Sequence, residues 1–193
     1  MSQIFGDFTE DSNTSQEYII VGFSPSATPI EQRWRNNGLS ADFLADYLKA
    51  FFPDNGSFPH INTPSKEIKS AVSYIANELL ENAMKFNCNR SPEPIVIQLQ
   101  VLSDRLIFTT TNSIESQKVS PFQEFLEELM SSDPHDLYVS MLERSALESD
   151  RFESHIGYLT MITDYGVKLG WKFENLSADP EVKMVTTMVK LCL

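Results

Sequence analysis

The segment Pro94 to Asn112, PIVIQLQVLSDRLIFTTTN, restricts the possible folds of this chain more than any other. Two runs rich in β-branched and other apolar residues are separated by Ser103 and Asp104, a pair typical of turns. Strand-forming runs joined by so short a turn predict an antiparallel β-hairpin.

The other predicted elements surround this hairpin in a regular order. Further strands are expected at 17–24, 167–175 and 182–193, the last two joined by an Asp-Pro turn. The segment 30–53 is expected to form two helical pieces, broken at 36–38, and Ser40 is the N-cap of the second piece. A long helix is expected from Thr63 to about Asn87. Two more helices are expected to begin at the N-caps Ser120 and Asp133, and another spans 155–166. This order predicts an α+β fold, a two-layer sandwich with helices on one face of a mixed or mainly antiparallel sheet.

The chain length favours one domain. With 193 residues, 41% of them hydrophobic, the chain can bury a substantial core. Residues 1–16 are polar and acidic, and we expect a flexible N-terminal arm that packs only through Ile4, Phe5 and Phe8. The single domain is therefore expected over 17–193.

The charge balance excludes several classes of partner. Lysine and arginine number 15 against 27 acidic residues, a net charge of -12, so neither nucleic acid nor an anionic membrane is an expected partner. There is no run of about 18 apolar residues and no secretory signal pattern, and the two cysteines fit no metal-ligand spacing. We expect a cytoplasmic protein.

The helix expected from Thr63 to Asn87 carries polar residues in an unusual place. On a helical wheel centred on Ile75, Asn82 falls about 20° away, inside the apolar stripe, and Glu78 and Lys85 lie along its edge. The stripe consists of Ile68, Val72, Ile75, Leu79, Ala83 and Phe86. Glu78, Asn82 and Lys85 can therefore converge on one site beside the core.

Two explanations account for polar groups at this position. Burial of an unpartnered amide or carboxylate costs on the order of 1 to 3 kcal/mol, so each group needs a polar partner. One candidate partner is nearby backbone or a bound water. The other is a ligand that carries a cation and phosphates, in which Asn82 binds the cation, Glu78 orients or deprotonates a hydroxyl and Lys85 neutralises phosphate.

The stretch NELLENAMKF resembles the N-box of the GHKL superfamily, the ATPases and kinases with the Bergerat fold that include gyrase, MutL, histidine kinases and anti-sigma-factor serine kinases. Glu78, Asn82, Ala83, Lys85 and Phe86 match its pattern position by position. The resemblance implies ATP and Mg²⁺ as cofactors, with Asn82 coordinating Mg²⁺, Glu78 as the catalytic carboxylate and Lys85 touching phosphate.

Two glycine-rich boxes of that family are incomplete in this chain. Asn112 stands where the family places an adenine-reading Asp, and the glycines that should follow are absent. The second box keeps only Gly157, where backbone N–H groups at a helix N-terminus can still approach phosphate. The resemblance also implies a helical ATP lid over about 113–154.

Such incomplete boxes are similar to those of SiaB-type kinases and of related cyanobacterial regulators. The segment RWRNNGLSADFLADYL, together with ANELLENAMKFN, also resembles the cyanobacterial regulators. This implies an ATP-binding regulator, a serine/threonine protein kinase acting on a small STAS-like partner in a partner-switching system. The alternative is an inactive GHKL-like binding module that sequesters its partner.

Arg33, Trp34 and Arg35 form a basic and aromatic cluster in an otherwise acidic chain. One interpretation is a helix end whose arginines pair with local carboxylates. The other is a docking surface for the protein partner or for a second copy of the chain, because Trp and Arg are enriched at binding hot spots.

Overall fold

The computed structural model describes residues 2–10, 17–24, 30–48, 65–147, 153–176 and 179–193. Five helices and six strands lie within these residues. The strands are β1 (Gln3–Gly6), β2 (Tyr18–Phe23), β3 (Ile95–Val101), β4 (Arg105–Glu115), β5 (Lys168–Asn175) and β6 (Val182–Cys192). The helices are α1 (Ile30–Tyr47), α2 (Ser65–Phe86), α3 (Ser116–Ser131), α4 (Pro134–Leu147) and α5 (Glu153–Tyr165).

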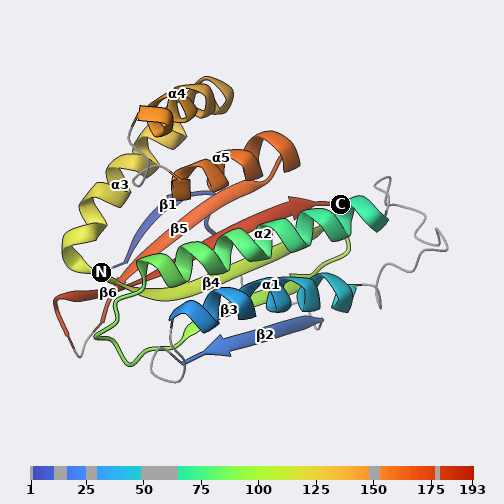
Figure 1. Ribbon diagram of the computed structural model, residues 1–193, viewed down its shortest axis with the longest axis horizontal. Helices are drawn as coiled ribbons and strands as arrows, with labels where there is room; N and C mark the ends of the chain where they lie inside the picture. The colour runs from blue at the N-terminus through green and yellow to red at the C-terminus, as the bar shows by residue number, and fades with distance from the viewer. Residues whose placement is uncertain (1, 11–16, 25–29, 49–64, 148–152, 177–178) are drawn as a thin grey trace.

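All six strands form one antiparallel sheet in the order β1-β5-β6-β4-β3-β2, and the helices lie on one side of it (Figure 1). The predicted hairpin is confirmed as β3 and β4, which pair from Val96 opposite Thr111 to Val101 opposite Leu106. The predicted α+β, two-layer arrangement is therefore confirmed, and the sheet is antiparallel throughout.

The core lies between α2 and the centre of the sheet. The stripe predicted for α2 is buried except at Phe86, which is partly exposed, and Val72 and Ile75 are fully enclosed. Alternate residues of β3 and β4, among them Leu99 and Phe108, are buried as well. A strand exposes successive side chains on opposite faces, so this alternation sends one set of side chains toward the helices.

Helix α1 differs from its predicted form in two respects. It runs without a break through Asn36, Asn37 and Gly38, although these residues predict an interruption. A glycine in a helix costs only about 1 kcal/mol, less than the burial of the stripe that α1 packs against α2. That stripe comprises Ala41, Leu44 and Ala45, with Leu48 directly after the helix, whereas Phe43 is 56% exposed.

Helix α3 begins at Ser116, four residues before the predicted N-cap at Ser120. The turn between β5 and β6 holds its first residue, because the Ser116 N–H donates to the Glu181 carbonyl at 2.8 Å and its hydroxyl to the Pro180 carbonyl at 3.0 Å. Pro121 consequently lies inside the helix. At this position a proline cannot donate to the Gln117 carbonyl, and its ring crowds that carbonyl.

Part of the segment expected to be a flexible arm belongs to the sheet. Residues Gln3 to Gly6 form β1 and pair with β5, and the chain then turns at Gly6, whose φ is +63°. The Asp7 N–H donates to the Leu169 carbonyl at 2.8 Å. Residues 7–8 then pass directly over Gly170, which has no side chain to block them.

Two other predicted helix ends are confirmed. The Asp133 carboxylate caps α4 by accepting from the backbone N–H groups of His135 and Asp136 at 2.9 and 3.2 Å. Gly166, with φ of +62°, ends α5. Among the described residues, no helix combines the length and apolar character needed to cross a lipid bilayer.

Candidate functional site

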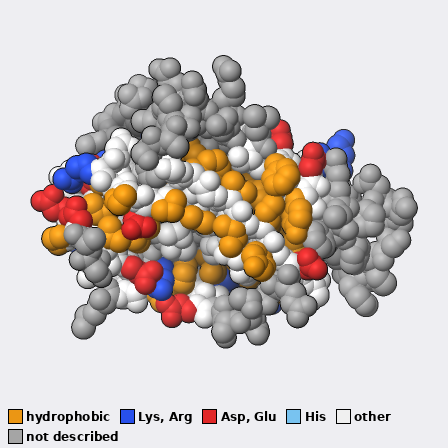
Figure 2. All heavy atoms as spheres, turned by 90° about the horizontal axis from the view of Figure 1, so that it is seen from below, with side chains coloured by type: hydrophobic (Ala, Val, Ile, Leu, Met, Phe, Trp, Pro, Cys, Tyr) orange, Lys and Arg blue, Asp and Glu red, His pale blue; other side chains and the backbone are white. Residues whose placement is uncertain are grey.

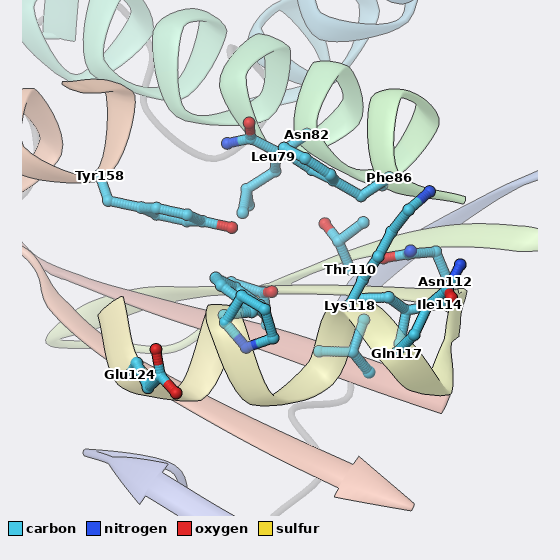
Figure 3. A pocket seen from close by; sticks show the side chains of 15 residues that line it. Leu79, Asn82, Phe86, Thr110, Asn112, Ile114, Gln117, Lys118, Glu124 and Tyr158 are labelled. Atoms are coloured by element: carbon cyan, nitrogen blue, oxygen red, sulfur yellow. The ribbon is translucent and has the colours of Figure 1, made fainter. Parts of the chain in front are cut away.

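A cavity of about 740 Å³ lies between α2, α3, the start of α5 and the strands β4 and β6 (Figure 3). Its size is within the range of sites that bind small molecules and cofactors. The lining is Leu79, Asn82, Ala83, Phe86, Thr110, Asn112, Ile114, Gln117, Lys118, Pro121, Phe122, Glu124, Tyr158, Val185 and Thr187.

Helix α2 contributes one face of the cavity through residues spaced three and four apart. Leu79, Ala83 and Phe86 are apolar, and Asn82 interrupts them. Asn82 is only 6% exposed, and its Nδ2 has no hydrogen-bond partner within the protein. A buried amide donor without an acceptor is costly, so Asn82 is a candidate ligand-binding group.

Strands β4 and β6 contribute the floor. Thr110 and Asn112 are two residues apart on β4, so both point to the helical face, and Thr187 pairs directly opposite Thr110 on β6. The Thr110 hydroxyl is buried and also has no partner within the protein. Asn112 donates through Nδ2 to the Ser113 carbonyl at 3.0 Å, which orients its amide group.

Asn87, the residue that follows α2, fixes the position of this helix over β4. Its Oδ1 accepts from the Ser113 N–H at 3.2 Å and from the Ser113 hydroxyl at 2.9 Å. The Cys88 N–H donates to the Ser113 carbonyl at 2.9 Å. These hydrogen bonds hold the end of α2 against β4 directly beside Asn112.

Helix α3 forms the wall opposite α2 and contributes Lys118, the one lysine or arginine among the described lining residues. In Figure 3 the Lys118 side chain extends from α3 toward Phe86 at one end of the cavity. Its Nζ lies 3.3 Å from Glu115 Oε2, which also accepts from Gln117 at 3.0 Å. The hydrogen bond from Gln117, followed by that from Lys118, lowers the pKa of the Glu115 carboxyl.

Tyr158 from α5 closes the remaining end, with its hydroxyl directed into the cavity (Figure 3). Burial raises the pKa of this phenol, while a hydrogen bond with the Thr187 side chain acts in the opposite direction. The ring packs edge-on against Trp171 at 5.5 Å and stacks near Phe122 at 6.5 Å. Tyr158 is therefore held rigidly and remains a neutral hydroxyl at physiological pH.

Glu78 lies one helical turn before Asn82 and packs against Gly157 of α5. A Cβ atom at position 157 would overlap the Glu78 carboxylate, so a residue other than glycine would require the end of the Glu78 side chain to move. Burial, and to a smaller extent the charge of Glu81, raises the pKa of Glu78 to about 7. A carboxyl with a pKa near neutrality suits proton transfer.

The structure brings together some of the residues predicted for the site. Asn82 and Asn112 line the cavity, and Glu78 and Gly157 contact each other beside it. Lys85 is exposed on α2, with its Nζ 5.9 Å from the centre of the Phe86 ring, and does not line the cavity. Arg33, Trp34 and Arg35 lie in α1, but their side chains fall outside the described residues.

Six polar lining residues were not predicted for the site, namely Thr110, Gln117, Lys118, Glu124, Tyr158 and Thr187. Thr110 shares the strand face of Asn112, so strand alternation signals its position. Gln117 and Lys118 lie in the first turn of α3, ahead of the helix start predicted at Ser120. Thr187 and Tyr158 reach the cavity only through the pairing of β6 with β4 and the packing of α5, and no local pattern signals either contact.

The cavity offers few ligands for a metal ion held by protein alone. Within the described residues, no three His, Cys, Asp or Glu side chains are grouped so that they can hold a metal. A divalent cation bound at Asn82 therefore needs most of its oxygen ligands from a bound molecule or from water.

Comparison with known proteins relates the chain to others only through its fold. No protein-family model and no curated protein sequence matches it. A solved structure described as the crystal structure of the SiaB–SiaC complex from Pseudomonas aeruginosa contains a chain similar in fold, with a TM-score of 0.54 and 11% sequence identity. The match covers 91% of this chain and 89% of that one. At such low identity, the likeness establishes a shared architecture over nearly the whole chain.

Proposed function

We propose that this protein is a nucleotide-binding regulator of GHKL type that uses ATP with Mg²⁺ and acts on a protein partner. The observation that carries the proposal is Asn82, whose amide is buried in a cavity of about 740 Å³ with its Nδ2 lacking a partner. An acceptor supplied by a ligand removes this energetic cost.

The donor set of the cavity fits a nucleotide. Asn112, Thr110 and Thr187 provide polar groups on a floor that also carries the apolar Ile114 and Val185, which suits a planar base. Lys118 supplies positive charge at the end of the cavity, which suits phosphate. Rotation of the Asn82 amide presents either its nitrogen to a phosphate oxygen or its oxygen to Mg²⁺. ATP would supply the transferable phosphoryl group and most of the oxygen ligands for the cation.

The likeness in fold to a chain of the SiaB–SiaC complex supports a protein as the regulated partner. Together with the N-box resemblance, it favours phosphorylation of a serine or threonine on a small STAS-like protein. In this role Glu78 would act as the catalytic carboxylate, because its pKa of about 7 lets it accept a proton near neutral pH.

A second function, sequestration of the partner without phosphoryl transfer, is favoured by the surroundings of Glu78. This carboxyl packs against Gly157 and is not part of the cavity lining. A nucleotide would then control the shape of the surface that includes α3, since Gln117 and Lys118 of that helix line the cavity.

Calorimetry with ATP and Mg²⁺ tests nucleotide binding, and we expect heat from the wild type and none from Asn82→Leu. Absence of heat from the wild type contradicts the proposal. Hydrogen exchange over residues 116–147 tests whether nucleotide binding is coupled to the mobility of α3 and α4. We expect the backbone amides of both helices to exchange more slowly when ATP is present.

Transfer of label from radioactive ATP to the partner distinguishes the two functions. A kinase labels the partner, and Glu78→Gln abolishes the label but preserves ATP binding. A sequestering module binds the partner in a nucleotide-dependent manner and leaves it unlabelled.

A further inference from the structure

Strand β2 forms one edge of the sheet, and no strand in the described part of the chain pairs with its outer side. It runs for six residues, Tyr18 to Phe23, whereas β1 at the opposite edge has four. Long open edges are sites where a further strand can add.

The register with β3 identifies the backbone groups that β2 leaves open. The Val101 N–H donates to the Glu17 carbonyl at 3.0 Å, which marks a hydrogen-bonded position. Such positions alternate along an antiparallel pair, so Ile19 and Val21 bond inward to β3. The N–H and C=O groups of Tyr18, Ile20 and Gly22 therefore point away from the sheet, as a new strand requires.

The edge lacks the features that usually prevent strand addition. Natural edge strands carry charged residues, prolines or bulges, and Tyr18 to Phe23 contains no charge and no proline. Tyr18 is 52% exposed and Ile20 is 53% exposed, both on the face of the sheet opposite the helices. Figure 2 views the molecule from below, the side on which β2 lies in Figure 1, and shows apolar side chains across the middle of that side.

We propose that β2 pairs in antiparallel fashion with β2 of a second copy, joining two sheets into one continuous sheet. A twofold axis at Ile20 places the two Ile20 residues opposite each other as a hydrogen-bonded pair. The same axis places Tyr18 opposite Gly22 of the second copy. A Cβ built at Gly22 meets nothing within 4 Å, so the surface there is open to the ring of Tyr18. An aromatic side chain covering a cross-strand glycine is a favourable pairing in sheets.

The charges near the strand are compatible with this pairing. The two Glu17 carboxylates would lie about 20 Å apart, because three residues separate each of them from the axis. The net charge of -12 on each copy acts over a longer range and opposes association. Added salt should therefore strengthen the dimer by screening that repulsion.

Light scattering with size-exclusion chromatography tests the interface. We expect a wild-type dimer that persists at high salt, and Ile20→Lys should weaken it by about tenfold or more, since two lysines would then face each other. The matched control is Val139→Lys on α4, which places the same charge at a side chain of comparable exposure, 43%. A monomeric wild type, or a dimer that Ile20→Lys leaves intact, overturns the proposal.

Cross-linking tests the register. Cα atoms of a hydrogen-bonded antiparallel pair lie about 5.5 Å apart, within reach of a disulfide. In a Cys192→Ser background, which removes the exposed cysteine, Ile20→Cys should form a covalent dimer under mild oxidation. Tyr18→Cys should not, because the two positions would lie about 13 Å apart. Equal cross-linking of both variants overturns the proposed pairing.

Discussion

Replacement of Asn82 by leucine should make the free protein more stable while abolishing nucleotide binding. The Asn82 Nδ2 is buried without a partner, and such a donor costs about 1 to 3 kcal/mol. Leucine removes the donor and adds apolar surface beside Leu79 and Phe86, which line the same cavity. We expect a gain of about 1 to 2 kcal/mol in the free energy of unfolding, a rise of roughly 2 to 8 °C in Tm for a chain of this size.

Asn87 offers a matched control at the end of the same helix. It is exposed to the same extent as Asn82, 6%, but its amide accepts two hydrogen bonds from Ser113. Asn87→Leu leaves the Ser113 N–H without its acceptor and the Ser113 hydroxyl with only the longer contact to the Cys88 carbonyl, at 3.4 Å, and should cost about 1 to 3 kcal/mol. Thermal and denaturant unfolding of the two variants should therefore shift in opposite directions.

The refuting result is a loss of stability in Asn82→Leu of similar size to that in Asn87→Leu. Such a loss would mean that the Asn82 amide already has a structural partner and is not reserved for a ligand. Addition of ATP and Mg²⁺ should raise the Tm of the wild type and leave that of Asn82→Leu unchanged.

Three further changes probe the surroundings of the cavity. Gly157→Ala should change the free energy of unfolding by less than about 1 kcal/mol, because the flexible end of Glu78 can move away from the new methyl group and alanine favours helix α5, so a loss above about 2 kcal/mol in denaturant unfolding would show that the carboxylate is held in place. Between pH 4.5 and 7 the folded wild type holds its Glu78 proton more tightly than the unfolded chain does, so its stability should fall as the pH rises through this window. Glu78→Gln should remove that slope in a pH series of unfolding curves and be more stable than the wild type at pH 8, by on the order of 1 kcal/mol because solvent screens this half-buried group. Lys118→Met should weaken ATP binding about tenfold in calorimetry but change AMP binding little, and equal losses for both ligands would exclude a phosphate contact.

The parts of the fold that could be predicted are those whose signals are local. The β3–β4 hairpin follows from two β-rich runs and a turn, and the buried face of α2 follows from helical spacing. The break in α1 and the start of α3 were wrong because tertiary contacts outweighed local preference. Packing against α2 carries α1 through Gly38, and the β5–β6 turn anchors α3 at Ser116.

The residues of the candidate site also fall into those that the sequence signals and those that only the tertiary structure brings together. Asn82 could be identified because it lies on the periodic apolar face of α2, and Asn112 because of the position it holds in the resemblance to the GHKL superfamily. Lys118, Tyr158 and Thr187 arrive from three other elements, and their convergence depends on how the sheet and helices assemble. Lys85 has the helical spacing expected of a site residue, and yet its side chain is exposed on α2.

A crystal structure of the protein with saturating ATP and Mg²⁺ tests the central claim most directly. The proposed function predicts nucleotide density in the cavity between α2 and β4, with the Asn82 side chain bonded to the ligand or its cation. A cavity that stays empty, or that is filled by the protein's own side chains, contradicts it.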